Sequence, residues 1–347
     1  MKDRNILILG GGFAGARLAQ ELTKSGFSNV TLVDRKDYFE VTYSTLRTLA
    51  EPDMGERARL KYADFIKSGF RQGNVTELGE HNAKLDDATH LGFDIAVAAT
   101  GSSYRSFPVA KSADAISIED RAREMAGEHE RLVAAQKVLI LGGGAVGVEL
   151  AGEIAGHYPD KSVTVAEAGD RLLGTLKPRA GRIAERQLKA LGVNIRTGTR
   201  LSPEDPEYRD ADIVYMCVGL VPNTELMQSR FASSLDGSGR IRVDDQLRVV
   251  GSENIYAIGD CASIPAVKFG YVADAQGLLL AKNFAAMADG KLARPYKPQA
   301  VMSLVPVGRK QGLIQLPFGV TTWRFLVNMK QKDMFISRQF GGLGVRR

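Results

Sequence analysis

A glycine-rich turn that occurs twice is the feature of this sequence that most constrains its fold. The first copy, Gly10-Gly11-Gly12-Phe13-Ala14-Gly15, follows the apolar run 5–9 and precedes a helical pattern, and Asp34 ends the next strand-like run. The second copy, Gly142 to Gly147, follows the run 138–141 and leads to Glu167 in the same way. A buried strand, such a turn, a helix and a second strand form a βαβ unit. The repeat therefore predicts an internal duplication.

Each glycine of the turn has a separate physical role. The first allows the tight bend, the second lets the backbone approach a pyrophosphate, and the third lets helix and strand pack closely. These are Gly10, Gly12 and Gly15 in the first copy and Gly142, Gly144 and Gly147 in the second. Asp34 and Glu167 stand where a carboxylate can accept hydrogen bonds from ribose hydroxyls. The alternative is a pair of purely structural turns, but strand, helix and acid recur together in both copies, so we predict two bound dinucleotides.

The remaining apolar runs complete an α/β fold. Strands are predicted at 93–99, 211–218 and 254–258, an amphipathic helix at 179–191 and a long helix at 271–288. We therefore predict two Rossmann-like dinucleotide-binding domains, the second inserted in the first, with a small C-terminal extension. The expected boundaries are 1–115 and 236–295 for the first domain, 116–235 for the inserted domain and 296–347 for the extension.

Two further turns indicate which dinucleotides bind. Thr100-Gly101 closes one predicted strand, and Gly259-Asp260 closes another shortly before the long helix. Asp260 can accept a hydrogen bond from a ribityl hydroxyl, and the positive N-terminus of a helix near Tyr271 can stabilise negative charge on a reduced flavin. This combination resembles the two-dinucleotide-binding flavoproteins, in which the N-terminal unit holds FAD and the inserted unit holds NAD(P)H.

Cysteine and histidine usage narrows the chemistry. Disulfide reductases of this superfamily carry paired cysteines beside the flavin, whereas the corresponding stretch 37–48 contains none. We interpret Cys217 and Cys261 as small buried residues rather than redox centres. The four histidines are scattered without ligand spacing, so no metal site is expected. A bound flavin would then do the chemistry.

The charge of the chain is unevenly distributed. It holds 46 Lys and Arg against 40 Asp and Glu, yet the last 54 residues contain ten bases and one acid, Asp333. This tail carries a charge of +9, which favours a negatively charged partner surface. Val320, Trp323, Val327 and Lys330 share a face at helical spacing, which predicts an interfacial segment for an anionic membrane. The alternative is an ordinary capping subdomain whose basic side faces water.

Over essentially its whole length the chain resembles the ferroptosis-suppressor protein family, also called the AIF-homologous mitochondrion-associated inducer (AMID) family. The resemblance is carried by the two glycine-rich turns, Leu46-Arg47, Tyr158-Pro159, and the stretches 34–39, 70–73, 256–262 and 332–335. It implies an FAD enzyme that uses NAD(P)H to reduce ubiquinone-like quinones at membranes. By this resemblance Arg47, Val75 and Asp260 contact FAD, Glu149 lies near the junction of nicotinamide and flavin, and Lys330 and Phe335 lie by the flavin and the quinone.

The sequence also gives expectations about the nicotinamide cofactor and about the location of the protein in the cell. Glu167 would repel the 2′-phosphate of NADPH, although Arg171 could offset part of this repulsion, so NADH is expected over NADPH. We find no signal peptide and no apolar run of the length, about 18 residues, that a membrane-spanning helix needs. Lys2 excludes N-myristoylation. We expect a cytoplasmic protein that associates peripherally with a membrane through its tail, and the sequence leaves a homodimer open.

Two other functions fit the sequence less well. A type II NADH dehydrogenase of a respiratory membrane would use the same chemistry in a different physiological role. An AIF-like interaction protein would bind nucleic acid through the basic tail. The aromatic and apolar residues interleaved in the tail suit lipid at least as well as bases, so nucleic acid is not the expected partner.

Overall fold

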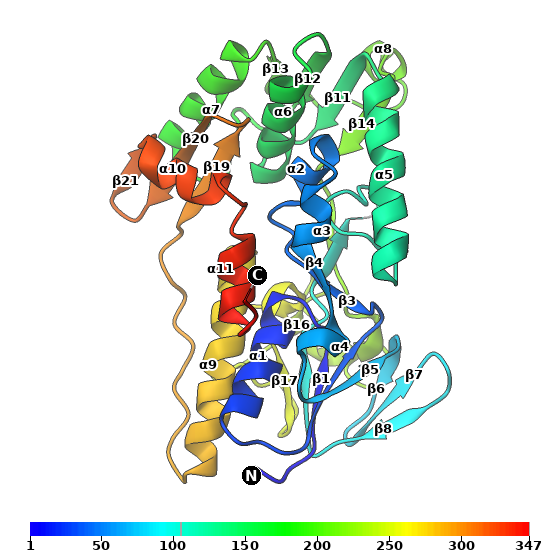
Figure 1. Cartoon of the computed structure of the whole chain (residues 1–347). Coiled ribbons are helices and arrows are strands. Elements are labelled where there is room, and N and C mark those ends of the chain that lie inside the picture. The colour runs from blue at the N-terminus through cyan, green and yellow to red at the C-terminus, as the bar shows by residue number, and fades with distance from the viewer. Residues whose placement is uncertain (105, 347) are drawn as a thin grey trace.

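The computed structural model describes residues 1–104 and 106–346. Two parallel sheets lie one above the other in an elongated α/β molecule (Figure 1). Each sheet contains the strand that leads into one of the glycine-rich turns. The predicted fold class, two Rossmann-like units with a C-terminal extension, is confirmed.

The first sheet is built from the apolar runs of the N-terminal unit. Its five parallel strands lie in the order β17-β9-β1-β2-β5. They are β1 (Ile6–Leu9), β2 (Val30–Asp34), β5 (Gly69–Gln72), β9 (Ile95–Ala98) and β17 (Ile255–Ala257). Helix α1 (Phe13–Lys24) follows β1 and packs closely on the long helix α9 (Gly270–Ala288), because Gly277 leaves no Cβ to collide with the Ala14 carbonyl.

The second sheet belongs to the inserted unit. Its four parallel strands lie in the order β13-β12-β11-β14. They are β11 (Lys137–Leu141), β12 (Ser162–Ala166), β13 (Asn194–Arg196) and β14 (Ile213–Met216). The helices of this unit are α5 (Ile118–Ala134), α6 (Ala145–His157), α7 (Pro178–Ala190) and α8 (Pro206–Arg209). Helix α5 begins where the Ser117 hydroxyl accepts a hydrogen bond from the Asp120 N–H, an N-cap that stabilises the first turn.

Smaller elements lie beside and between the two sheets. The helices are α2 (Thr45–Ala50), α3 (Met54–Ala58), α4 (Tyr62–Phe65) and three 3₁₀ turns at Glu225–Met227, Ala232–Ser234 and Gly259–Cys261. The strands are β3 (Tyr38–Glu40), β4 (Arg59–Lys61), β6 (Val75–Leu78), β7 (Asn82–Leu85), β8 (His90–Gly92), β10 (Ser102–Tyr104), β15 (Leu220–Pro222), β16 (Ile241–Arg242) and β18 (Ala262–Ser263). Strand β10 pairs antiparallel with β15 and ties the two units together.

The C-terminal segment divides its buried side chains between the two units. It contains β19 (Ser303–Val307), β20 (Gln311–Leu316), β21 (Gly319–Thr321), α10 (Arg324–Gln331) and α11 (Ile336–Gly342). Val305 and Val307 join the core of the inserted unit, whereas Ile336 and Phe340 join the core of the first. Figure 1 shows α11 in red beside α1 and α9. The extension therefore shares both cores. The boundaries at 115, 235 and 295 stay predictions.

The predicted interfacial face of the tail is wrong. Val320 lies in β21, so it cannot share a helical face with residues of α10. Val327 and Lys330 are buried, and Trp323 just before α10 is exposed. Helical spacing alone did not show that a strand ends and a helix begins between Val320 and Arg324. No helix of the described residues is both long and apolar enough to cross a membrane.

Gly15 and Gly12 provide a matched test of the close packing at the first turn. A Cβ on Gly15 would come within 1.9 Å of the Gly10 carbonyl oxygen, whereas the space at Gly12 is open among the described residues. We expect Gly15→Ala to destabilise the cofactor-free protein by about 1–3 kcal/mol, because backbone must move. Gly12→Ala should lower its melting temperature less, because the added Cβ meets open space and only the preference for Gly over Ala at the N-cap of α1 is lost. Thermal unfolding followed by circular dichroism checks both, and equal melting temperatures for the two variants would contradict the packing role.

Candidate functional site

A large cleft runs between the two units and along the C-terminal segment. Its volume is about 1880 Å³. A pocket for one drug-sized ligand measures roughly 300–1,000 Å³, so this cleft has room for more than one large ligand. The predicted site residues that line it are Gly10, Gly11, Gly12, Phe13, Ala14, Asp34, Val75, Thr100, Gly101, Gly144, Glu149, Asp260, Lys330 and Phe335.

The two glycine-rich turns have the same geometry. Gly10 has φ +105° and Gly142 has φ +106°, a backbone conformation that residues other than glycine rarely adopt. A Cβ on Gly147 would come within 1.9 Å of the Gly142 carbonyl oxygen, as one on Gly15 would with Gly10. Gly15, Gly142 and Gly147 thus allow the conformation and the close packing of the turns. They are not among the described residues that line the cleft.

An acid holds each turn in the same way. The Gly11 N–H donates to the Asp34 carboxylate at 2.6 Å, and the Gly143 N–H donates to the Glu167 carboxylate at 2.6 Å. Burial raises the pKa of Asp34, against the Gly11 and Lys36 N–H groups, which lower it. Glu167 is half-buried at the rim and is not among the described residues lining the cleft. Both acids therefore lie beside the turn that a pyrophosphate would approach.

Three helices begin at this cleft. The residues Phe13, Ala145 and Gly270 are the first of α1, α6 and α9, and all three line it. Within the described chain no side chain caps the first N–H groups of these helices. Such open N-termini are suited to phosphate groups and to negative charge on a flavin. The two turns fit two dinucleotides, and the start of α9 at Gly270 agrees with the helix predicted near Tyr271.

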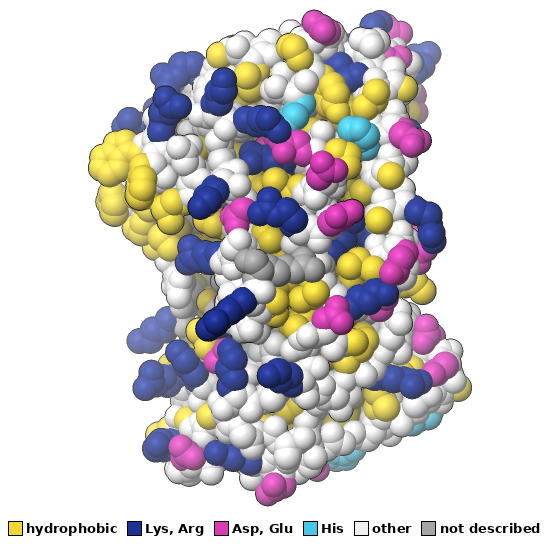
Figure 2. Space-filling model, in the orientation of Figure 1, with side chains coloured by type: hydrophobic (Ala, Val, Ile, Leu, Met, Phe, Trp, Pro, Cys, Tyr) yellow, Lys and Arg dark blue, Asp and Glu magenta, His cyan; other side chains and the backbone are white. Residues whose placement is uncertain are grey.

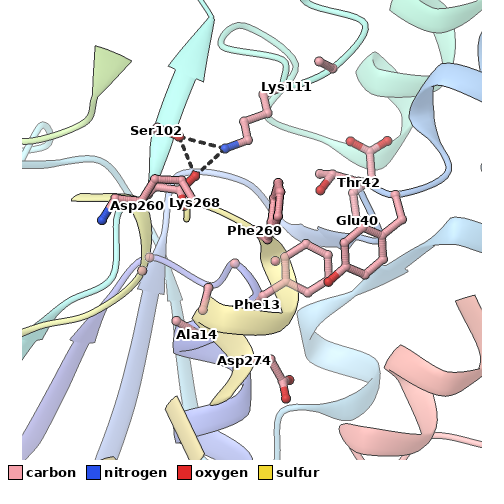
Figure 3. A pocket seen from close by; sticks show the side chains of 18 of the residues that line it. Phe13, Ala14, Glu40, Thr42, Ser102, Lys111, Asp260, Lys268, Phe269 and Asp274 are labelled. Carbon is pink, nitrogen blue, oxygen red and sulfur yellow. Dashed lines mark hydrogen bonds and ion pairs between the residues drawn. The ribbon is translucent and has the colours of Figure 1, made fainter. Parts of the chain in front are cut away.

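Asp260 is part of a polar cluster in this cleft (Figure 3). Its carboxylate accepts hydrogen bonds from Ser102 Oγ at 2.6 Å and from Lys111 Nζ at 2.8 Å. Burial raises the pKa of Asp260, but Lys111 and Ser102 outweigh it and leave the pKa below its usual value. Asp260 is thus an ionised acceptor, the state needed to bind a hydroxyl. Sequence reasoning missed Ser102 and Lys111, because an isolated serine or lysine carries no motif.

Glu149 and Lys330 form a buried ion pair at the other side of the cleft. Lys330 Nζ donates to Glu149 at 2.9 Å and to the Leu304 carbonyl at 3.2 Å. Both side chains are almost fully buried. Burial raises the pKa of Glu149, and Lys330 opposes this shift. The sequence resemblance named both residues, which lie 181 positions apart, and the structure brings them into contact.

A group of aromatic rings begins with Tyr43 beside this pair. Lys330 Nζ lies 6.0 Å from the ring centroid of Tyr43. Tyr43 stacks on Phe13 with centroids 4.8 Å apart and meets Phe335 edge-on at 6.4 Å. Phe13 and Phe269 also line the cleft (Figure 3). The surroundings of Lys330 therefore suit a flat, apolar ring. Tyr43 carried no signal in the sequence.

Arg47 is placed differently from the other predicted flavin-site residues. It is not among the described residues that line the cleft. Its guanidinium is buried, donates to the Glu153 carboxylate at 2.8 Å and donates to the Gln331 carbonyl at 2.7 Å. This arrangement does not support the predicted contact of its side chain with FAD. Resemblance to a family at one position could not show that the Arg47 guanidinium contacts Glu153 of α6 and Gln331 of α10.

The structure also places the two cysteines and a cluster of possible metal ligands. Cys217 borders the cleft and Cys261 is fully buried, and burial raises the pKa of both thiols. Ligand atoms of Glu51, Glu153 and His157 lie within 4.8 Å of one another. Arg47 binds the carboxylate of Glu153 and Arg309 that of Glu51, so this group is an ion-pair cluster.

Comparison with known proteins agrees with this site. The family model of pyridine nucleotide-disulphide oxidoreductases matches residues 4–288. The chain belongs to this family. It is also 30% identical to ferroptosis suppressor protein 1 of Xenopus tropicalis over 361 residues, which covers 98% of this chain and 96% of that protein. The resemblance found in the sequence is thereby confirmed, and the chain is an oxidoreductase.

Two solved structures share the fold of this family member. Sulfide:quinone oxidoreductase from Aquifex aeolicus superposes with a TM-score of 0.78 at 15% identity and covers 99% of this chain and 92% of its own. NDH2 from Plasmodium falciparum in complex with NADH superposes with a TM-score of 0.74 at 17% identity, with coverage of 98% and 97%. At these identities the likeness concerns the fold alone. FAD and a nicotinamide dinucleotide are the cofactors that the family implies, and the two open turns fit them.

Proposed function

We propose that this flavoprotein passes reducing equivalents from NADH to a ubiquinone-like quinone at a membrane surface. The observation that carries the proposal is the buried Glu149–Lys330 pair, which lies among aromatic rings in the cleft shared by both turns. Its tail-side wall contains Leu304, Leu326 and Met329. An apolar wall with one ion pair suits a ring that is apolar and carries two reducible oxygens.

The residues of the chain have separate tasks in this reaction. When bound, FAD accepts hydride from a nicotinamide and supplies two electrons to a quinone. Gly10 to Gly15 and Asp260 would hold FAD, and Gly142 to Gly147 with Glu167 would hold NADH. Reduction of a quinone to a quinol takes up two protons together with the two electrons. Lys330 Nζ can donate one of them to a quinone oxygen and regain one from water, water can supply the other, and Glu149 fixes the direction of Nζ.

Lys330 and Glu149 give the direct test. The purified yellow protein is mixed with NADH without oxygen until the flavin bleaches, and a short-chain quinone is then added. We expect rapid reoxidation of the wild type and reoxidation slowed about tenfold or more in Lys330→Met and Glu149→Gln, because general acid catalysis is worth about 10²–10⁴-fold. FAD content per chain is the control. Wild-type flavin that stays reduced in the presence of quinone would remove the proposal.

The surroundings of Glu167 support NADH as the preferred donor. Its carboxylate lies at the rim of the second turn, where it would face a 2′-phosphate. Arg171 cannot readily offset this repulsion, because its guanidinium donates to the carbonyls of Gly174 at 2.8 Å and Leu176 at 3.2 Å. Like charges about 4 Å apart cost on the order of 4 kcal/mol at an effective dielectric of 20, before screening.

Nucleotide preference can be measured directly. We expect kcat/KM for NADH to exceed that for NADPH at least tenfold, and Glu167→Ser to narrow the ratio by about tenfold, which corresponds to about 1.4 kcal/mol. Arg171→Ala is the matched control and should leave the ratio unchanged. Steady-state kinetics with both nucleotides decide the matter, and equal values in the wild type refute the preference.

An exposed apolar cluster supports the membrane contact. Phe318, Trp323, Phe325 and Met329 are 87%, 72%, 79% and 47% exposed. Figure 2 shows apolar side chains projecting at the left edge, over β21 and α10, with basic side chains above and below. Met329 also lines the cleft, so the cluster continues into its wall. Aromatic residues flanked by bases are typical of segments that lie in a membrane interface.

Trp323 and Phe325 test this surface. We expect the double variant Trp323→Ser/Phe325→Ser to lose most of its sedimentation with vesicles containing phosphatidylserine, since it buries less apolar area in the bilayer. Its activity with a water-soluble quinone should stay unchanged. Leu292→Ser is the matched control, because Leu292 is 92% exposed and follows α9, at the end of the molecule away from α10. Equal sedimentation of the double variant and the wild type would contradict the assignment.

A further inference from the structure

We infer that Arg47 is a positioning residue, which clamps the end of α10 and thereby holds Lys330 in the cleft. The inference rests on the proposed function, because it concerns the residue that we place beside the quinone. Arg47 lies on α2, Glu153 on α6 and Gln331 on α10, so its guanidinium joins three elements from distant parts of the chain.

The two sides of the Arg47 guanidinium have different partners. Nε and Nη2 face the Glu153 carboxylate, with distances of 3.1 and 2.8 Å to Oε1. Nη1 donates to the Gln331 carbonyl at 2.7 Å. Arg47 and Glu153 are 4% and 1% exposed. A planar guanidinium can make both contacts at once in a fixed geometry, whereas a lysine ammonium on its flexible stem cannot.

Gln331 is the last residue of α10, and Lys330 precedes it. The final carbonyls of a helix have no partner within the helix, and positive charge is favourable at that end. Arg47 supplies both a donor and a charge to the Gln331 carbonyl. The Gln331 side chain also donates to the Gly308 carbonyl at 2.9 Å, which fixes the same residue from the other side. The last turn of α10, which contains Lys330, is therefore held in place.

Helix α6 connects the clamp to the catalytic pair. Glu149 and Glu153 lie one turn apart on α6, and both are buried. Lys330 from α10 binds Glu149, and Arg47 from α2 binds Glu153. Without Arg47, the end of α10 would lose an anchor, and the Glu153 carboxylate would keep only the His157 ring, 3.8 Å away, as a partner next to the Glu149–Lys330 pair. We therefore expect loss of the clamp to disturb the direction of Lys330 Nζ before it disturbs FAD.

The experiment compares two clamp variants with a control, all as holoenzymes. Arg47→Lys keeps the positive charge but loses the planar guanidinium that contacts Glu153 and Gln331 at once. Arg47→Met/Glu153→Met removes both buried charges, a replacement that is often neutral for stability. The control is Arg309→Gln, since Arg309 also joins the C-terminal segment to α2 through Glu51 but does not contact Gln331 among the described residues. FAD content and melting temperature are measured for each.

The expected result is a split between the two half-reactions. Anaerobic bleaching by NADH should change less than threefold in both clamp variants, while reoxidation by a short-chain quinone should slow about tenfold. Amide hydrogen exchange over 324–334 should become faster in the clamp variants and stay unchanged in Arg309→Gln. In a Lys330→Met background, Arg47→Lys should add less than a twofold effect, because both changes act on one group.

Three results would overturn the inference. Loss of FAD from Arg47→Lys at an unchanged melting temperature would assign Arg47 to flavin binding instead. Additive effects of Arg47→Lys and Lys330→Met on reoxidation would assign it a merely structural role. Reoxidation at the wild-type rate in both clamp variants would refute the positioning role of Arg47 and leave the proposed quinone reduction standing. A wild-type protein whose reduced flavin ignores quinones is a distinct outcome, which overturns the proposed function and the clamp together.

Discussion

Two buried carboxylates on one face of α6 determine how the three parts of this molecule meet. Glu149 and Glu153 can stay charged in the interior only with a cation in contact, because an unpaired buried charge costs about 3–5 kcal/mol. The cations come from elsewhere: Lys330 from the C-terminal segment and Arg47 from the first unit. The inserted unit is thereby fixed to both of its neighbours. The cleft exists in its present shape because these contacts set the distance between its walls.

A third buried carboxylate also links the inserted unit to the first unit. Glu40 on β3 is bound by Arg59 at 2.8 Å and by Arg121 of α5 at 3.1 Å. Burial alone would raise the pKa of Glu40, but Arg121 and Arg59 lower it to about 2. Arg121 also donates to the carbonyls of Pro108 and Val109 in the segment that leads into the inserted unit. Ion pairs thus anchor the inserted unit at two separate places, which favours a fixed orientation over free domain motion.

The sequence predicted the elements whose signal is local. Gly10 to Gly15 and Gly142 to Gly147 could be placed on strand ends, because the strand, turn, helix and acid occur within one short stretch. The long helix α9 followed from its sequence pattern, and family resemblance named Glu149 and Lys330 as site residues without predicting the ion pair between them. Ser102, Lys111 and Tyr43 could not be found, since their roles depend on neighbours far away in the chain. The contacts of Arg47 with Glu153 and Gln331 could not be foreseen for the same reason.

The tail shows why charge counts alone are a poor guide to a partner surface. A charge count treats its bases as equivalent, yet Lys330 is buried in the cleft and Arg309 is paired with Glu51. Bases such as Arg324 and Lys332 stay exposed near the apolar cluster. Because β19 and α11 belong to the cores of different units, the segment cannot leave the body to reach a membrane. In the proposed membrane contact the whole molecule must therefore approach the bilayer. Because Met329 belongs to both the apolar cluster and the cleft wall, the cleft would then lie next to the lipid.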